Sequence, residues 1–266
     1  MTDSRPIGLF DSGVGGLSVW REVVRRMPHE ATLYFADSAH CPYGPRPAAE
    51  IQALSAAITR FLLTHESKLI VVACNTASAA ALESLRAEFD VPIIGMEPAL
   101  KPAAEATQTG HVGVLATEGT LNGYLFKNTS ERHARAIEVH VQVGEGLVEL
   151  VEAGQLDTPE TESLLRQYLE PMLTAHADQL ALGCTHYPLL LPLIERVVAG
   201  RATVIDPAQA VARQVQRVLM QRNLETETGC VAQHRFFTTG QPNILQRLAS
   251  VLSQHTVQVS PVQLIA

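Results

Sequence analysis

Lysine is scarce in this chain, and its scarcity limits the ligands that the protein can hold. Of the 20 basic residues among 266, only Lys68, Lys101 and Lys127 are lysine, and the net charge is -7. No basic run is dense enough to follow a phosphate backbone, so we expect no nucleic-acid partner. Pyridoxal phosphate forms its Schiff base on a lysine, and none of the three has an evident site around it, so we do not expect that cofactor.

Long apolar runs are also missing. No window approaches the roughly 18 consecutive apolar residues of a membrane span. The first residues, MTDSRPIGLF, lack the charged start and apolar stretch of a secretory leader. We therefore expect a cytoplasmic protein without a membrane partner. Few residues precede the first expected strand, so we also expect no long amino-terminal regulatory extension.

Cysteine is present but sparse. The four cysteines stand at positions 41, 74, 184 and 230, and this spacing does not resemble the dense disulfide framework of a small secreted protein. We expect them to be reduced thiols. With 46% hydrophobic residues, the chain can fill one large core or two smaller ones.

The sequence does contain a regular alternation of strands and helices. Short segments rich in β-branched or aromatic residues are separated by stretches with helical periodicity. The expected strands are residues 6–10, 31–37, 68–74, 91–96, 111–117, 137–143, 179–184 and 202–206. Near-continuous apolar strands between helices predict an α/β fold, with mostly parallel sheets covered by helices on both faces.

The two sets of four strands are in register, which indicates an internal duplication. Gly8 precedes Cys74 by 66 residues, and Gly113 precedes Cys184 by 71. An acidic residue followed by proline recurs 22 to 24 residues after each cysteine. We predict two similar domains related by pseudo-symmetry, with the site in the cleft between them. The predicted domains are residues 1–97 plus 208–266, and residues 98–207.

The positions of Cys74 and Cys184 suggest chemistry. Ligands of a parallel sheet bind beyond the carboxyl ends of its strands, where both cysteines stand. Residues able to cap a helix follow each thiol: Asn75, Thr76, Thr185 and His186. A helix amino terminus favours a thiolate, which predicts a lowered pKa for both thiols. Two facing units would place one thiol on each side of a ligand, so that one removes a proton from a carbon and the other returns one to the opposite face.

The nearby polar residues suit a small amino-acid-like ligand. Asp11, in the turn FDSGVGG, could accept an ammonium group or orient a thiol. The loop CPYGPR could present backbone N–H groups around Tyr43 and Gly44 to a carboxylate. Further donors toward a carboxylate are Ser12, Asn75, Thr76 and Thr185.

Other residues have simpler interpretations. Cys41 and Cys230 are expected to be small buried hydrophobes. The GVGG turn resembles a dinucleotide-binding loop, but Ser18 stands where the third glycine is required, so we interpret it as a tight turn. No Cys or His pair with two-residue spacing completes a zinc pattern, so we expect no metal site.

Four segments together resemble the signature of the glutamate racemase family. They are GLFDSGVGGLSV, YFADSAHCPYG, VVACNTASA and ALGCTHYPLL, and the similarity extends over essentially the whole chain. The resemblance implies two α/β domains, a site in their cleft, and cofactor-independent interconversion of L- and D-glutamate. It also implies that the enzyme supplies D-glutamate for peptidoglycan, and it is compatible with a homodimer.

The resemblance assigns roles to particular residues. Cys74 and Cys184 are the two acid-base residues, with Cys74 acting on D-glutamate and Cys184 on L-glutamate. The assisting polar residues are Asp11, Glu152 and His186. The substrate-contacting positions are Asp11, Ser12, Tyr43, Gly44, Asn75, Thr76, Thr185 and His186. Before Glu152 the chain has Gly144-Glu145 where the family commonly has Cys-Pro, so the match is weaker there.

Two other functions remain open from the sequence. The substrate could be aspartate or another small acid of the same superfamily, because the residues that set pocket size are not placed. Alternatively, the protein could be a non-catalytic regulator, for example of DNA gyrase. Relative turnover of glutamate and aspartate separates the substrates, and intact catalytic residues make any regulatory role additional.

Overall fold

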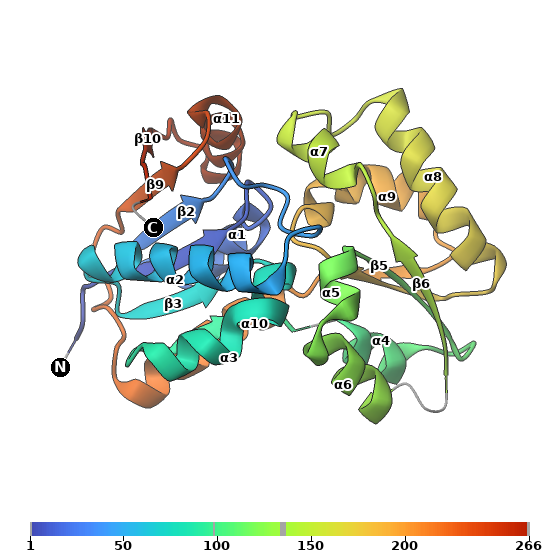
Figure 1. The fold of residues 1–266 in the computed structure, drawn as a ribbon, viewed down its shortest axis with the longest axis horizontal. Coiled ribbons are helices and arrows are strands. Elements are labelled where there is room, and N and C mark those ends of the chain that lie inside the picture. Colours follow the sequence, from blue (N-terminus) through green and yellow to red (C-terminus); the bar gives the residue numbers. More distant parts are fainter. Residues whose placement is uncertain (1, 98, 134–136, 265–266) are drawn as a thin grey trace.

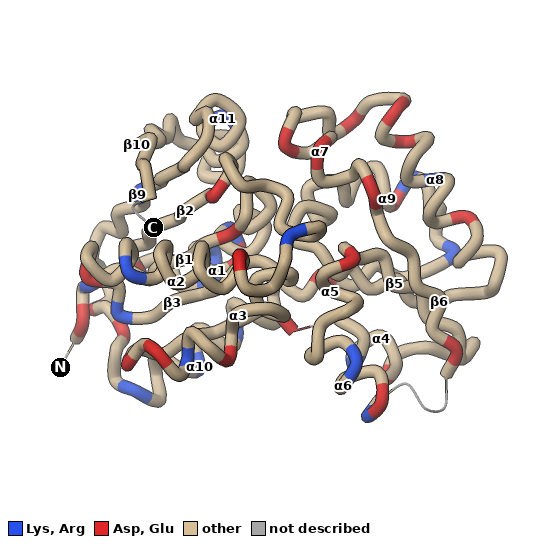
Figure 2. The backbone as a smooth tube through the Cα atoms, in the orientation of Figure 1, with Lys and Arg blue, Asp and Glu red and all other residues tan. Residues whose placement is uncertain are grey.

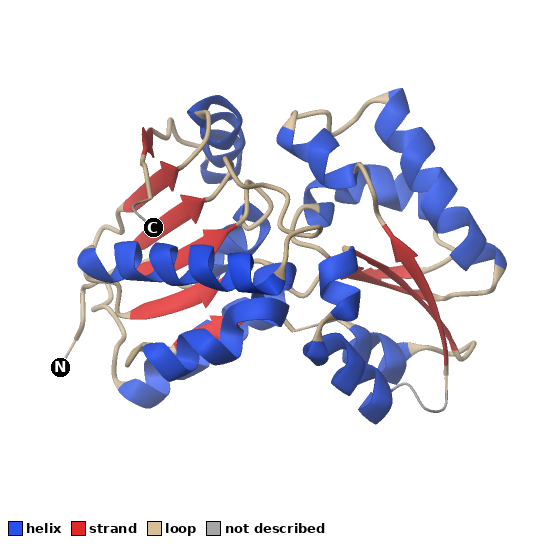
Figure 3. Cartoon of the chain, in the orientation of Figure 1, coloured by secondary structure: helices blue, strands red, loops and turns tan. Residues whose placement is uncertain are grey.

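Two parallel sheets organise the chain, one in each half of the molecule (Figure 1). The computed structural model describes residues 2–97, 99–133 and 137–264. In both halves the strands lie between helices (Figure 3). The α/β class predicted from the sequence is therefore confirmed.

The first sheet has the strand order β10-β9-β2-β1-β3-β4, and all its pairs are parallel. Its strands are β1 (Ile7–Asp11), β2 (Thr32–Ala36), β3 (Leu69–Val72), β4 (Ile93–Gly95), β9 (His234–Thr238) and β10 (Val259–Pro261). Its helices are α1 (Leu17–Arg26), α2 (Ala48–Thr64), α3 (Asn75–Glu88), α10 (Ala208–Arg222) and α11 (Pro242–Ser253).

The central strands of this sheet are buried on both faces, which explains their continuous apolar sequences. Ile7 and Leu9 of β1 belong to the core that includes residues of α1, α10 and α11. Phe10, one position further, belongs to the opposite core, which includes residues of α2 and α3. Successive side chains of a strand point to opposite faces, so β1 contributes to both cores.

The second sheet has the order β6-β5-β7-β8 and is also entirely parallel. Its strands are β5 (His111–Ala116), β6 (Glu138–Val143), β7 (Gln179–Gly183) and β8 (Thr203–Ile205). Its helices are α4 (Leu100–Ala106), α5 (Glu118–Asn122), α6 (Tyr124–His133), α7 (Leu147–Glu152), α8 (Pro159–Thr174), the 3₁₀ turn η1 (Tyr187–Leu190) and α9 (Leu191–Val198).

The two sheets repeat one strand order. In each half the first strand lies between the second and the third, and the fourth pairs with the third, giving β2-β1-β3-β4 and β6-β5-β7-β8. The register is also repeated, since Gly8 faces Ile70 and Gly113 faces Leu180. Each cysteine follows the third strand of its sheet, as the sequence spacing predicted.

The tail after residue 207 returns to the first half. Strand β9 pairs with β2, helix α10 packs against α1, and in Figure 1 the red carboxyl-terminal elements lie beside the blue amino-terminal ones. A buried ion pair lies nearby. Lys68 Nζ is 2.6 Å from Glu30 Oε2 and donates to Thr226 Oγ1 at 3.1 Å. The domain boundaries stated above remain a prediction.

The charges do not gather on one face. Figure 2 shows Lys and Arg positions distributed over both halves among acidic ones. Within the described ranges, no helix is both long enough and apolar enough to cross a membrane.

Candidate active site

Both strand-end cysteines line one small cavity between the halves. The residues around it come from the carboxyl ends of strands in both sheets, where ligands of parallel sheets bind. The lining residues are Ser12, Pro42, Tyr43, Gly44, Cys74, Asn75, Thr76, Thr117, Val148, Cys184, Thr185 and His186. The structure thus brings both cysteines and most of the predicted substrate contacts to one place. Asp11 and Glu152 do not line the cavity but contact two residues that do, Thr185 and His186 respectively.

Cys74 occupies the cap position of α3, which differs from the expectation that Asn75 and Thr76 cap this helix. Its Sγ accepts the N–H of Ala77 at 3.4 Å and lies 3.9 Å from Ser12 Oγ. Burial raises the pKa of Cys74 well above its ordinary value, and the nearby Asp11 carboxylate raises it further, while the Ala77 N–H opposes both. The predicted lowering is therefore wrong for this thiol, because desolvation outweighs the helix terminus.

Cys184 has different surroundings. It precedes the 3₁₀ turn η1 rather than an α-helix, and the capping position of that turn belongs to His186. Cys184 Sγ lies 3.7 Å from His186 Nδ1. Burial acts to lower the pKa of His186, but hydrogen bonds with Cys184, Cys41 and Glu152 raise it well above its ordinary value. The imidazole can therefore carry positive charge next to this sulfur.

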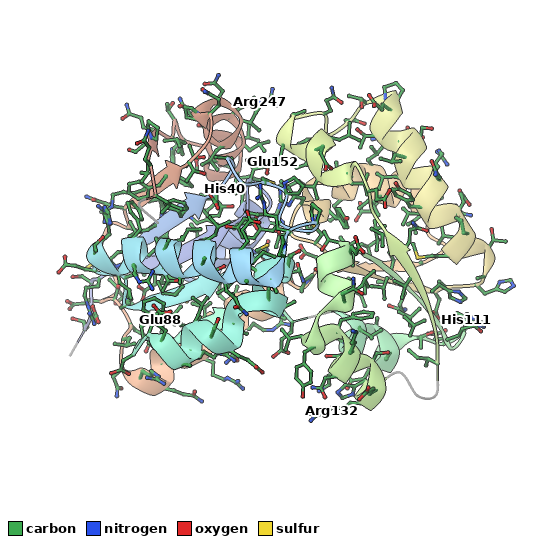
Figure 4. All side chains as sticks on the ribbon, viewed as in Figure 1. His40, Glu88, His111, Arg132, Glu152 and Arg247 are labelled. Atoms are coloured by element: carbon green, nitrogen blue, oxygen red, sulfur yellow. The ribbon has the colours of Figure 1, made fainter. Side chains whose placement is uncertain are left out.

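Glu152 fixes the other side of the His186 ring. Its Oε1 lies 2.7 Å from His186 Nε2 and accepts the N–H of Val14 at 2.7 Å. Glu152 ends α7 in the second half, whereas Val14 belongs to the first. Figure 4 places Glu152 between the two halves. One carboxylate therefore holds the ring and connects the halves.

The glycines of the FDSGVGG turn allow this close approach. A Cβ at Gly13 would lie 1.9 Å from Glu152 Oε1, and one at Gly15 would lie 2.3 Å from His186 Nδ1. The turn is thus more than a tight bend, which corrects the sequence interpretation. Side chains could not stand at either position without moving Glu152 or His186.

Asp11 is fully buried beneath the cavity. Its Oδ2 accepts the N–H of Gly16 at 2.7 Å and the hydroxyl of Thr185 at 3.4 Å, so it connects residues of both halves. The hydroxyl of Ser12 is 3.4 Å from Oδ1. Burial raises the pKa of Asp11, although the positive charge of His186 opposes this shift.

The remaining lining residues present few side-chain charges. Tyr43 and Gly44 both line the cavity, and the hydroxyl of Tyr43 already donates to Asp37 at 2.6 Å. Asn75 Oδ1 is buried and has no hydrogen-bond partner. No Lys or Arg is among the residues that line the described cavity.

Sequence reasoning missed Thr117, whose hydroxyl lies 2.9 Å from that of Thr76 across the two halves. The duplication contained the signal. Gly113 corresponds to Gly8 in the duplicated unit, and the same offset of 105 residues makes Thr117 the equivalent of Ser12. Both follow the first strand of their sheets.

The other two cysteines also differ from expectation. Cys230 is exposed and Cys41 is only half-buried, so neither is a buried hydrophobe. Cys41 Sγ lies 4.0 Å from Ser12 Oγ, and burial raises its pKa to about 11.

The cavity itself is almost closed, with a free volume of about 10 Å³. That volume is close to the minimum for one water molecule. A larger hollow of about 920 Å³ lies between β4, α3 and α10, but neither cysteine lines it. We assign the chemistry to the small cavity because the thiols are there.

Comparison with known proteins defines the class to which this fold and cavity belong. The sequence profile of the Asp/Glu/Hydantoin racemases matches residues 7–215, and the chain belongs to this family of amino-acid racemases. Its curated relatives carry a more particular name. The glutamate racemase of Roseiflexus sp. (strain RS-1) is 48% identical over 254 residues, which cover 92% of each chain. That of Pseudomonas aeruginosa (strain PAO1) is 47% identical over 251 residues, 94% of each chain.

Solved structures agree with this assignment. Escherichia coli glutamate racemase, in complex with L-glutamate and the activator UDP-MurNAc-Ala, superposes with a TM-score of 0.87 at 31% identity, covering 98% of this chain and 100% of that one. Francisella tularensis glutamate racemase, in complex with D-glutamate, gives 0.85 at 30% identity and 98% coverage of both chains. The protein is accordingly an isomerase with the two-domain α/β fold of this family.

Proposed function

We propose that the protein interconverts L- and D-glutamate without a cofactor, using Cys74 and Cys184 as two bases on opposite sides of the substrate. The observation that carries the proposal is that one cavity is lined by both thiols, each following the third strand of its own sheet. The glutamate named in the relatives supports this substrate.

The polar groups of the cavity complement an amino acid. Asn75 Oδ1 is an acceptor without a donor, and the ammonium group is the donor that glutamate offers, so we assign that contact to Asn75. The hydroxyls of Ser12, Thr76 and Thr185 and the backbone N–H groups near Tyr43 and Gly44 then donate to the carboxylates. Binding by neutral donors fits a cavity without Lys or Arg among its lining residues.

Racemisation needs one thiolate and one thiol. The thiolate removes the α-proton, the electron pair of the C–H bond moves toward the α-carboxylate, and the opposite thiol delivers a proton to the other face. We assign the attack on D-glutamate to Cys74 and that on L-glutamate to Cys184. Asp11 is the assisting residue beside Cys74, and His186 held by Glu152 is the assisting residue beside Cys184.

The α-proton is a far weaker acid than a thiol, so the site has to stabilise the carbanion. Preorganised donors in a site without water are worth much more than the same donors in water. A cavity of about 10 Å³ cannot admit glutamate, so the halves have to separate before binding and close around it. We place the moving bodies at residues 1–97 plus 208–266 and at residues 98–207, because β9 and β10 belong to the first sheet.

The product would be used in the cell wall. We place the enzyme in the cytoplasm, where thiols remain reduced, and assign it the supply of D-glutamate for peptidoglycan.

The decisive experiment measures loss of α-deuterium from L- and D-glutamate in ordinary water, and follows the conversion of each enantiomer into the other by circular dichroism. No cofactor is added. The wild type should exchange and racemise both enantiomers, and Cys74→Ser and Cys184→Ser should each stop racemisation while melting like the wild type. Cys230→Ser is the matched control, since that thiol is exposed. A cysteine variant of the cavity with wild-type turnover in both directions would refute the two-thiol mechanism, and turnover of aspartate alone would refute the substrate.

A further inference from the structure

A third cysteine, outside the cavity lining, forms a candidate set of metal ligands together with Glu152 and with His186 of the cavity wall. Cys41, Glu152 and His186 each offer one ligand atom, and these three atoms lie within 4.8 Å of one another. Cys41 follows β2, Glu152 ends α7, and His186 follows β7. Because the three positions are far apart in sequence, no residue spacing could predict this group.

The donor set identifies the class of ion. Thiolate, imidazole and carboxylate together are typical ligands of zinc, whereas calcium and magnesium prefer oxygen. Three protein ligands leave the fourth tetrahedral position to water. Cys41 and Glu152 are half-buried, so an ion can reach them from solvent, while His186 lies behind them.

The surroundings hold these ligands in position. The N–H of Val14, a group outside the three ligands, donates to Glu152 Oε1 at 2.7 Å and orients that carboxylate. The turn that contains Gly13 and Gly15 leaves space for both side chains. Such outer contacts orient metal ligands and raise affinity.

We propose that Cys41, Glu152 and His186 form a reversible inhibitory site for Zn²⁺. The ion would bind Cys41 Sγ, His186 Nε2 and a Glu152 oxygen, and the protons displaced from the thiol and the ring would pass to water. Bound zinc would remove Glu152 from His186 and fix the ring that lies 3.7 Å from Cys184 Sγ. Inhibition rests on the proposed racemase function, whereas binding does not.

The first test follows metal binding without turnover. In the triple variant Cys74→Ser, Cys184→Ser, Cys230→Ser, the remaining thiol is Cys41. Titration with Co²⁺ should produce the near-ultraviolet absorption of a thiolate–cobalt bond, and one equivalent of Zn²⁺ should remove it. Adding Cys41→Ser should abolish the absorption. If the triple variant binds Co²⁺ without this absorption, or if the absorption survives Cys41→Ser, the site is refuted.

A second group supplies a matched control. His111, Glu138 and His140 also place ligand atoms within 4.8 Å of one another, but they include no thiol. Figure 4 shows His111 on the outer side of the second half, away from Glu152. His140→Ala should therefore leave the thiolate absorption unchanged, and its loss in that variant would contradict the assignment to Cys41.

The second test uses the native protein. Zn²⁺ should inhibit racemisation, and a chelator should restore it. Loss of an outer contact lowers metal affinity by roughly 10- to 100-fold. Cys41 would be a direct ligand, so the zinc concentration that halves the rate should rise by more than this factor in Cys41→Ser. The rate of each protein with zinc is divided by its own rate without zinc. If Cys41→Ser and the wild type then show the same inhibition, the inhibitory role is overturned. Absence of racemisation alongside the cobalt absorption would instead refute the proposed function and leave the metal site intact.

Discussion

Replacing Gly15 by alanine should disable the His186 side of the cavity without disrupting the rest of the fold. The new methyl carbon would lie 2.3 Å from His186 Nδ1 and 2.7 Å from ring carbons Cγ and Cε1. Carbon contacts normally lie near 3.5 Å, so the ring has to retreat by about 1 Å. That retreat changes the 2.7 Å contact with Glu152 and the 3.7 Å separation from Cys184.

The size of the effect follows from this displacement. Misplacing a catalytic group by about 1 Å costs on the order of 100-fold in rate, which corresponds to about 2.7 kcal/mol. Overpacking should lower the free energy of unfolding by about 1–3 kcal/mol. Circular dichroism measures kcat from both enantiomers, and urea denaturation measures the loss of stability.

Gly8→Ala provides a control with similar crowding away from the cavity. Its new methyl carbon would lie 2.7 Å from Ser67 Oγ and 2.9 Å from Ile70 Cδ1. This variant should lose similar stability and keep the wild-type kcat. If Gly15→Ala turns over within twofold of the wild type, or if Gly8→Ala loses as much activity, the steric reasoning is refuted.

Three further perturbations have definite expected results. Lys68→Ala removes the cationic partner of the buried Glu30 carboxylate, which keeps only its hydrogen bonds from Thr226, so the free energy of unfolding in urea should fall by about 3–5 kcal/mol; a loss below about 1 kcal/mol would contradict this. Burial raises the pKa of the Cys74 thiol in the folded protein. Below the pKa of about 8.5 that the thiol has in the unfolded chain, both states hold its proton and this group causes no change of stability with pH; above it, the unfolded chain loses the proton first and the folded state is progressively destabilised. Wild-type stability should therefore fall more steeply than that of Cys74→Ser, by about 1.4 kcal/mol per pH unit, above that pH; parallel curves would refute it. Glu152→Gln removes the negative charge that positions the His186 ring, so kcat should fall by on the order of 100-fold, with partial rescue by Glu152→Asp; unchanged kcat would exclude Glu152 from positioning the ring.

Sequence reasoning located all eight strands of the repeated unit. Six of them are mostly buried and consist of near-continuous apolar runs, whereas β6 and β8 lie at the edges of the second sheet and were recognised from their β-branched residues. It did not identify β9 and β10 as strands. β10 has three residues, ends at Pro261 and lies at the sheet edge, and β9 begins with the polar pair His234-Arg235. Short or partly polar edge strands carry little periodic signal.

The same limit applies to the site. The cysteines were recognisable because the duplication repeats their distance from the first strand. The raised pKa of Cys74 could not be predicted, because it depends on complete burial and on Asp11, a residue of another strand. The need for Gly13 and Gly15 was also hidden, since the contact between Val14 and Glu152 joins residues 138 positions apart.

The two halves repeat one topology but give their thiols unlike surroundings. Cys74 accepts the Ala77 N–H, whereas Cys184 lies beside His186. Mirror-image amino acids have equal free energies in water, so kcat/KM must be the same in both directions, whichever thiol a variant impairs. Any difference between the two enantiomers must therefore appear as the same factor in kcat and in KM, so that their ratio stays equal. Unlike surroundings produce such a difference by altering how tightly one enantiomer is held before reaction. Glu152→Gln should thus shift the kcat of L-glutamate and of D-glutamate by different factors and reduce both values of kcat/KM by the same factor. Unequal kcat/KM values would mean that the measured reaction is not the interconversion of two enantiomers.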